Sequence, residues 1–197
     1  VGGDWYDTLP LPGGRVALVI GDVAGRGVDA AAMMGQLRSA LRAYILEGAT
    51  PAEALERLNR FMLSLAWDSM ATASVMLLEP ATGRMAYANA GHPPAHVLSP
   101  DGVARSLTEP LGVPLGALDA VTYEPGTAVL EPGATLVLYT DGVVEQRDEL
   151  IDRGIERLET SLVEGGVVDP EPLCERILRG TIGHDGSNDD VTLLVVQ

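Results

Sequence analysis

Residues Arg15–Gly27 read RVALVIGDVAGRG, and the rest of the chain can be interpreted from this stretch. Arg15–Ile20 is an apolar, β-branched run with the length of a strand, and a glycine ends it. Asp22 therefore comes at the tip of a buried strand, where further glycines allow a sharp turn. A carboxylate held there suits a hard cation or a phosphate group. A single Asp of this kind is more often the cap of a strand-to-helix turn.

Three other segments carry acids at the ends of apolar runs or in turns. They read GGDWYD at 2–7, LVLYTDG at 136–142 and SNDDVTLLVV at 187–196. Magnesium-like ions take oxygen ligands, and dinuclear phosphatase sites hold two ions about 4 Å apart. Such a site needs carboxylates from several strands, because an unpaired buried carboxylate is costly. The pattern therefore predicts a metal site built from distant parts of the chain.

Five motifs together resemble a known family. They are GGDWYD at 2–7, GDVAGRG at 21–27, NAGHPP at 89–94, TDGVVE at 140–145 and NDDVT at 188–192. In this order they resemble the metal-dependent protein phosphatase (PPM) superfamily, specifically its bacterial SpoIIE-type branch. That branch acts on serine and threonine phosphates, so the resemblance implies hydrolysis of a phosphoserine or phosphothreonine monoester on a protein.

The residue pattern indicates an α+β fold, in which antiparallel strands pair and helices pack outside them. The resemblance sharpens this to two antiparallel β-sheets packed face to face and flanked by α-helices, which the pattern alone does not distinguish from a single sheet. We see no repeat and no shift in composition, so we expect one domain over residues 1–197. The abrupt start at Val1 suggests a fragment of a longer protein.

Periodicity and turn residues predict the individual elements. Predicted helices are Val28–Leu46, Pro51–Ala66, Ile151–Val163 and Pro170–Arg179, the last with Asp169 as its N-cap. Val1–Asp7 is predicted to be the end of a strand that begins upstream. The other predicted strands are Arg15–Ile20, Ala71–Glu79, Met85–Ala90, Ala95–Leu98, Val103–Leu107, Val121–Tyr123, Ala128–Leu130, Thr135–Thr140 and Val191–Val196. Pro132-Gly133 is predicted to turn the chain between two of these strands.

The resemblance also implies the ligand set. Asp22 would bridge two Mn²⁺ or Mg²⁺ ions, with the Val23 carbonyl beside it, and Asp22 and Asp141 would carry the catalysis. Asp4, Asp141 and Asp189 would complete the metal site, and Asp7 and Asp190 rank below them. Metal-activated water would attack the phosphate, and no covalent protein nucleophile is needed.

Two further residues are assigned to the substrate or its phosphate. The family branch usually has histidine where Arg26 stands, and a guanidinium there could pair with phosphate. His92 lies in the NAGHPP motif, although a lone histidine more often packs within a loop. The phosphate-binding arginine of the family, if present, would precede Val1.

The composition excludes some partners. The formal net charge is −15, with 13 arginines and no lysine, so nucleic acid and anionic membrane are poor partners. No apolar run is long enough to predict a membrane span. The single Cys174 forms no internal disulfide, which favours a cytoplasmic setting.

The resemblance suggests a phosphorylated anti-sigma-factor antagonist as substrate and an upstream sensor domain as regulator. Such a domain could act through the predicted helices Val28–Leu46 and Pro51–Ala66, which follow the Asp22 loop, and dimerisation to a homodimer is one route. Two alternatives stay open. One is a catalytically silent binding module with the same fold, and the other is a hydrolase of small phosphate esters.

Overall fold

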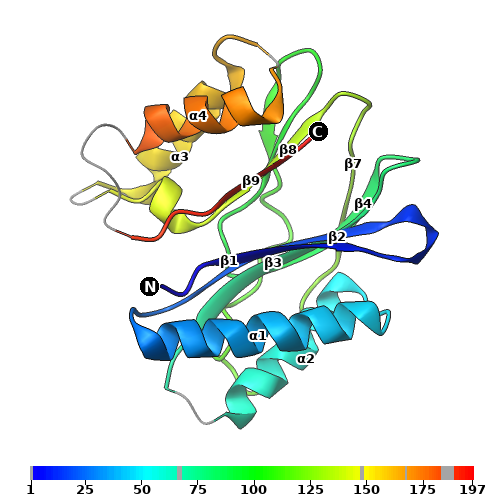
Figure 1. Ribbon diagram of the computed structural model, residues 1–197, viewed down its shortest axis with the longest axis vertical. Helices are drawn as coiled ribbons and strands as arrows, with labels where there is room; N and C mark the ends of the chain where they lie inside the picture. The colour runs from blue at the N-terminus through cyan, green and yellow to red at the C-terminus, as the bar shows by residue number, and fades with distance from the viewer. Residues whose placement is uncertain (1, 66–67, 147–148, 167, 183–188) are drawn as a thin grey trace. The chain divides into compact units, whose positions relative to one another are not determined.

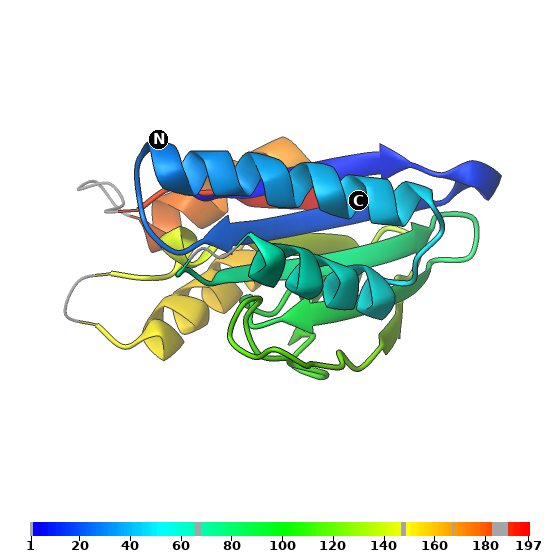
Figure 2. The same cartoon turned by 90° about the horizontal axis from the view of Figure 1, so that it is seen from below.

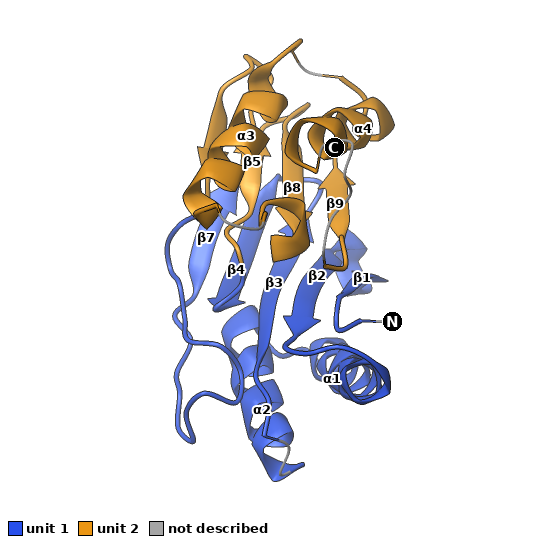
Figure 3. Cartoon of the chain, turned by 90° about the vertical axis from the view of Figure 1, so that its left-hand side faces the viewer, with its two compact units in different colours: residues 1–92, 108–129 blue, residues 93–107, 130–197 orange. Residues whose placement is uncertain are grey.

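The structure is a computed structural model that describes residues 2–65, 68–146, 149–166, 168–182 and 189–197. The chain divides into two units, which Figure 3 colours separately. The first unit is Val1–His92 with Thr108–Val129, and the second is Pro93–Leu107 with Leu130–Gln197. Each unit contains one antiparallel sheet and two α-helices. The α+β class with two antiparallel sheets and flanking helices is therefore confirmed, and the face-to-face packing of the sheets stays a prediction.

The first unit is built on a five-stranded sheet in the order β1-β2-β3-β4-β7 (Figure 1). Its strands are β1 (Trp5–Pro10), β2 (Val16–Val23), β3 (Ala71–Glu79), β4 (Arg84–Ala90) and β7 (Gly126–Val129), and a short 3₁₀ turn, η1 (Pro12–Gly14), joins the first two. Helices α1 (Val28–Leu46) and α2 (Pro51–Ser64) lie side by side over one face of this sheet (Figure 2). Helix α1 packs against β1 and β2, and α2 packs against β3 and β4.

The apolar stripe of α1 explains this packing. Its residues at helical spacing, Met33, Leu37, Leu41 and Ile45, are all buried. Helix α2 begins with a capping box, in which the Thr50 side chain accepts from the Glu53 N–H and the Glu53 carboxylate accepts from the Thr50 N–H. Met33 and its apolar neighbours on α1 are thus part of the core.

The second unit is built on a four-stranded sheet in the order β6-β5-β8-β9. Its elements are β5 (His96–Leu98), β6 (Ala104–Ser106), β8 (Thr135–Tyr139), η2 (Asp141–Val143), α3 (Ile151–Val163), α4 (Pro170–Thr181) and β9 (Leu193–Val196). Buried side chains of α3 and α4 form a core with those of β8 and η2. None of the helices in the described part of the chain is both long and apolar enough to cross a membrane.

The first hairpin is longer than predicted. Strand β1 runs on past Asp7 to Pro10, and β2 includes Asp22 and Val23, which the prediction placed after the strand. Both of these β2 residues pair with β3, so the ladder continues to the end of the motif. Asp22 is consequently held by neighbours on the sheet rather than by a turn.

The predicted strand at residues 121–123 was wrong, because these described residues form no strand. The predicted turn at Pro132-Gly133 is present between β7 and β8, but the two strands join different sheets: β7 pairs with β4 in the first, and β8 pairs with β5 and β9 in the second. Asp169 stands at the N-cap of α4 without a side-chain capping bond. The predicted end of the second helix, Ala66, lies outside the described residues.

Candidate functional site

Strands β1 and β2 place two of the predicted ligands opposite each other. Trp5 pairs with Gly21, and the N–H of Val23 donates to the carbonyl of Gly3 over 3.2 Å. The same register sets Asp4 against Asp22. Residues so placed have Cβ atoms about 5 Å apart on one face of the sheet, and like charges there repel each other. Two carboxylates in this arrangement have the donor chemistry of a hard-cation site.

Glycines of both motifs allow this close pairing. A Cβ atom on Gly3 would lie 2.2 Å from the Val23 carbonyl oxygen and 2.9 Å from Asp22 Oδ1. A Cβ atom on Gly21 would lie 2.3 Å from the indole ring of Trp5. No larger side chain fits at either position without a shift of the neighbouring atoms. The Val23 carbonyl and the Asp22 carboxylate, the predicted ligand pair, therefore both lie next to Gly3.

Asp7 lies on the other face of the sheet. Side chains alternate along a strand, so residues separated by three point to opposite sides. The Asp7 carboxylate is 7% exposed and faces α1, where its Oδ2 lies 3.6 Å from Arg38 Nε and 3.5 Å from Arg42 Nη1. The Asp7 carboxylate therefore lies on the opposite face from Asp4 and anchors β1 to α1, and its lower-ranked role as a metal ligand stays a prediction.

His92 is a buried part of the scaffold at the same end of the sheet. Its side chain is 3% exposed, and its Nδ1 atom lies 2.8 Å from Thr72 Oγ1. Its backbone N–H and carbonyl both bond to the Asn89 side chain at 2.8 Å. Thr72 is the β3 partner of Asp22. Sequence reasoning missed Thr72, whose only signal was its position near the start of a predicted strand.

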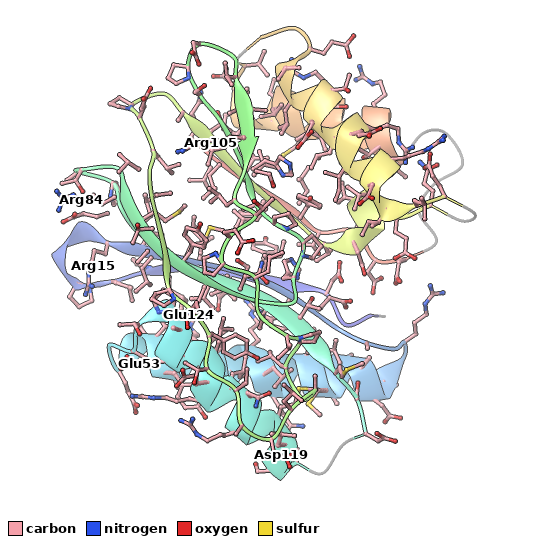
Figure 4. The ribbon with its side chains drawn as sticks, turned by 180° about the vertical axis from the view of Figure 1, so that it is seen from behind. Arg15, Glu53, Arg84, Arg105, Asp119 and Glu124 are labelled. Atoms are coloured by element: carbon pink, nitrogen blue, oxygen red, sulfur yellow. The ribbon has the colours of Figure 1, made fainter. Side chains whose placement is uncertain are left out.

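Arg26 follows β2 in an exposed turn that borders a hollow of about 380 Å³. The hollow is lined by Val23, Ala24, Gly25, Arg26, Asp29, Ala30, Asp68 and Ser69. Ser69 closes it by donating from Oγ to the Ala24 carbonyl over 3.1 Å. The opposite end of this sheet carries Arg15, just before β2, and Arg84, the first residue of β4 (Figure 4). Arg26 is thus the arginine that follows the Asp22 end of β2.

In the second unit the Asp141 turn packs against the segment that carries Asp189 and Asp190. A Cβ atom on Gly142 would lie 1.9 Å from the Asp190 carbonyl oxygen. The preceding Thr140 also holds this segment, because its backbone N–H donates to the carbonyl of Thr192 and its Oγ1 accepts from the Thr192 N–H, each over 3.0 Å. The N–H of Asp190 donates to Asp189 Oδ1 over 2.9 Å. Asn188 of the same motif lies outside the described residues.

The four main predicted acids thus fall into two pairs. The first unit brings Asp4 and Asp22 together, and the second brings the Asp141 turn to the segment that carries Asp189. Within the described ranges, no group of three or more Asp, Glu, His or Cys side chains is arranged to hold a metal ion. Neither unit supplies more than two of these acids.

Comparison with known proteins identifies the family. Residues 12–197 match the family described as Stage II sporulation protein E (SpoIIE). The chain belongs to the SpoIIE family. With its two antiparallel sheets and its five motifs, it is a SpoIIE-type phosphatase domain of the PPM superfamily.

Three relatives show how far the similarity extends. Phosphoserine phosphatase RsbP of Bacillus subtilis is 28% identical over 148 residues, which are 73% of this chain and 36% of RsbP. The crystal structure of the RsbU and RsbW domains of Rv1364c from Mycobacterium tuberculosis is 36% identical with a TM-score of 0.87, and the match covers 99% of this chain and 55% of that one. RsbX in complex with magnesium shares the fold at 19% identity, with a TM-score of 0.74 over 99% of this chain and 86% of its own. The SpoIIE-type chain spans about a third of the length of RsbP.

Proposed function

We propose that this chain is a metal-dependent protein phosphatase domain that hydrolyses a phosphoserine or phosphothreonine monoester. One observation carries the proposal: Asp4 and Asp22 lie opposite each other on one face of the β1–β2 hairpin, and Gly3 and Gly21 make that approach sterically feasible. Two like charges in that position repel each other, and a bound cation would offset that repulsion. Membership of the SpoIIE family and the similarity to a phosphoserine phosphatase support the same conclusion.

The donor set fits two Mn²⁺ or Mg²⁺ ions, because every proposed ligand is a carboxylate or a carbonyl oxygen. Following the family resemblance, we assign Asp4, Asp22, the Val23 carbonyl, Asp141 and Asp189 as ligands. Asp22 is the proposed bridging ligand, and Asp190 ranks below Asp189. The magnesium complex of RsbX, which has the same fold, is consistent with a hard divalent ion. When bound, such ions polarise phosphoryl oxygens and lower the pKa of a water molecule.

The protein's own contribution is charge and position. Asp22 and Asp141 each hold a negative charge at a fixed point of their own unit. Asp22 lies within strand β2, and Asp141 lies in a turn that packs against the segment with Asp189 and Asp190, just before β9. Arg26 offers a guanidinium next to Asp22's strand end, where it would bind phosphate oxygens through paired hydrogen bonds. No covalent intermediate is required.

The proposed substrate is a phosphoserine on a regulatory protein of the anti-sigma-factor antagonist class, which the family resemblance supports. We further propose an upstream regulatory domain that acts through α1 and α2. Helix α1 directly follows the loop after Asp22, so a shift of α1 would be transmitted to that ligand. A homodimer formed through such a domain is one way to produce the shift.

The test is turnover of a phosphoserine protein by the full chain with Mn²⁺, after removal of all metal with EDTA, and after metal is restored. We expect activity to vanish with chelator and to return with Mn²⁺ or Mg²⁺. Full activity in excess EDTA would refute the metal mechanism. Turnover of p-nitrophenyl phosphate but of no phosphoprotein would indicate a small-ester hydrolase, and no turnover with metal bound would indicate a silent binding module.

A further inference from the structure

We propose that His92 is a positioning residue that holds Thr72 and, through Thr72, the end of β2 that carries Asp22. This inference rests on the proposed function, and it assigns the NAGHPP histidine a role that does not involve contact with phosphate. The ring acts through its Nδ1 atom, which lies 2.8 Å from Thr72 Oγ1.

The histidine is fixed from both sides. The Asn89 side chain accepts from the His92 N–H and donates to the His92 carbonyl, each over 2.8 Å. Both residues are buried, with 5% of Asn89 and 3% of His92 exposed. Losing one of these partners would leave an unsatisfied polar group away from water, so the pair of bonds restrains the loop. The backbone of His92 is therefore held in place independently of Thr72.

The loop around the histidine is sterically closed as well. Gly91 has φ 68°, and a Cβ atom there would lie 2.7 Å from the Pro114 ring. A Cβ atom on Gly112 would lie 2.5 Å from the Asn89 carbonyl oxygen. The segment that contains Gly112 and Pro114 thus packs directly against the loop that carries His92.

Thr72 is the β3 residue that this arrangement restrains. It is the second residue of the strand, and ends of strands fray more readily than their centres. Thr72 pairs with Asp22 in the β2–β3 ladder, and its side chain therefore neighbours the Asp22 carboxylate on one face. A hydrogen bond between His92 and this strand end restrains both residues. Loss of the bond should loosen the ligand without disrupting the sheet.

Two pairs of substitutions separate this role from a direct role of the other ring nitrogen. The amide of asparagine occupies the position of histidine Nδ1, and the amide of glutamine occupies that of Nε2. We expect His92→Gln and Thr72→Val to lower turnover and Mn²⁺ affinity by about 10- to 100-fold, the range typical for groups that orient a metal ligand. His92→Asn and Thr72→Ser retain the bond and should recover most of the loss.

Two controls address stability. Thr127→Val makes the same chemical change at an exposed position on β7 and should alter neither quantity. Asn59→Ala removes a buried side chain that donates to the Leu118 carbonyl and accepts from the Gly116 N–H, so it should destabilise the same unit elsewhere. If it lowers turnover and Mn²⁺ affinity as much as Thr72→Val does at equal melting temperature, the role of Thr72 is merely structural and the proposal is overturned.

The outcomes also distinguish this inference from the proposed function. A wild-type chain without turnover would refute the phosphatase assignment alone, because Mn²⁺ titration and hydrogen exchange at the Asp22 and Val23 amides rank the variants without catalysis. Faster exchange in His92→Gln and Thr72→Val than in His92→Asn and Thr72→Ser supports positioning. The reverse order for the two histidine variants, or equal values for all four, overturns it.

Discussion

Gly142→Ala adds one methyl group and should weaken metal binding by the acids of the second unit. The new Cβ atom would lie 1.9 Å from the Asp190 carbonyl oxygen, whereas ordinary contacts begin at 3.4 Å. The segment with Asp189 and Asp190 would have to retreat by roughly 1.5 Å. Metal–ligand distances tolerate only about 0.2 Å, and a displacement of about 1 Å at a reacting centre can cost about 100-fold in rate. Overpacking of this kind costs about 1–3 kcal/mol in stability.

The assay is turnover on a phosphoserine protein across a Mn²⁺ titration, with the melting temperature measured on the same samples. We expect the Mn²⁺ concentration for half-maximal activity to rise and turnover at low Mn²⁺ to fall by about 100-fold. Gly35→Ala is the matched control. Gly35 lies on an exposed face of α1 with nothing within 4 Å of an added Cβ, so alanine should stabilise the helix by up to ~1 kcal/mol and leave turnover unchanged. Unchanged Mn²⁺ dependence in folded Gly142→Ala would refute the reasoning.

Three further predictions follow from individual side chains. Asp22→Asn removes a charge but keeps the shape of the side chain, so turnover should fall by orders of magnitude while thermal stability without metal stays equal or rises. The control Asp101→Asn, in an exposed hairpin turn, should change neither turnover nor stability. Near-wild-type turnover of Asp22→Asn would exclude Asp22 as the bridging ligand. Asp7→Asn should lower the free energy of unfolding by about 1 kcal/mol through the weakened ion pairs with α1, with Mn²⁺ affinity unchanged; a large loss of affinity would instead support Asp7 as a ligand. Burial lowers the pKa of His96 below its ordinary value of 6.5, against the opposing effect of Glu159, so the unfolded chain binds the proton more readily and stability should fall as pH drops below 6.5. The melting temperature should therefore depend less on pH between 7 and 5 in His96→Gln, and an equal dependence would contradict this assignment.

The helices of the first unit could be predicted because their signals are local. Helix α1 matches its predicted bounds, and the capping box at Thr50 forms as the residue types require. Apolar spacing along one helix and a cap at its start are properties of neighbouring residues, so no long-range information is needed. The hairpin between β1 and β2 was local in the same sense, since its turn contains Gly13 and Gly14 with φ near 75°.

The partner of each strand was harder to predict. The turn at Pro132-Gly133 was predicted and is present, but the turn residues do not reveal that β7 and β8 join different sheets. The same local residues turn a chain within one sheet or between two. Whether a strand pairs with β4 or with β5 depends on which strand edge is still unpaired, and this depends on contacts across the whole chain.

The side of the sheet on which each predicted ligand lies could be predicted only in part. Alternation along β1 already implies that Asp4 and Asp7 point to opposite sides of the sheet. The bounds of the strand were the missing information. The strand was predicted to end at Asp7, and a residue at that position can cap the turn that follows. Its buried pairing with α1 became visible only with β1 extended to Pro10. The glycines of the motifs could not be explained from the sequence either. Gly3 leaves space for the Val23 carbonyl, and Gly142 leaves space for the Asp190 carbonyl, and in both cases the two residues are distant in sequence. An acidic residue can be recognised as a candidate ligand from its own position in the sequence. The close approach of two such residues depends on a glycine that leaves space for a distant segment, and only the fold shows which segment that is.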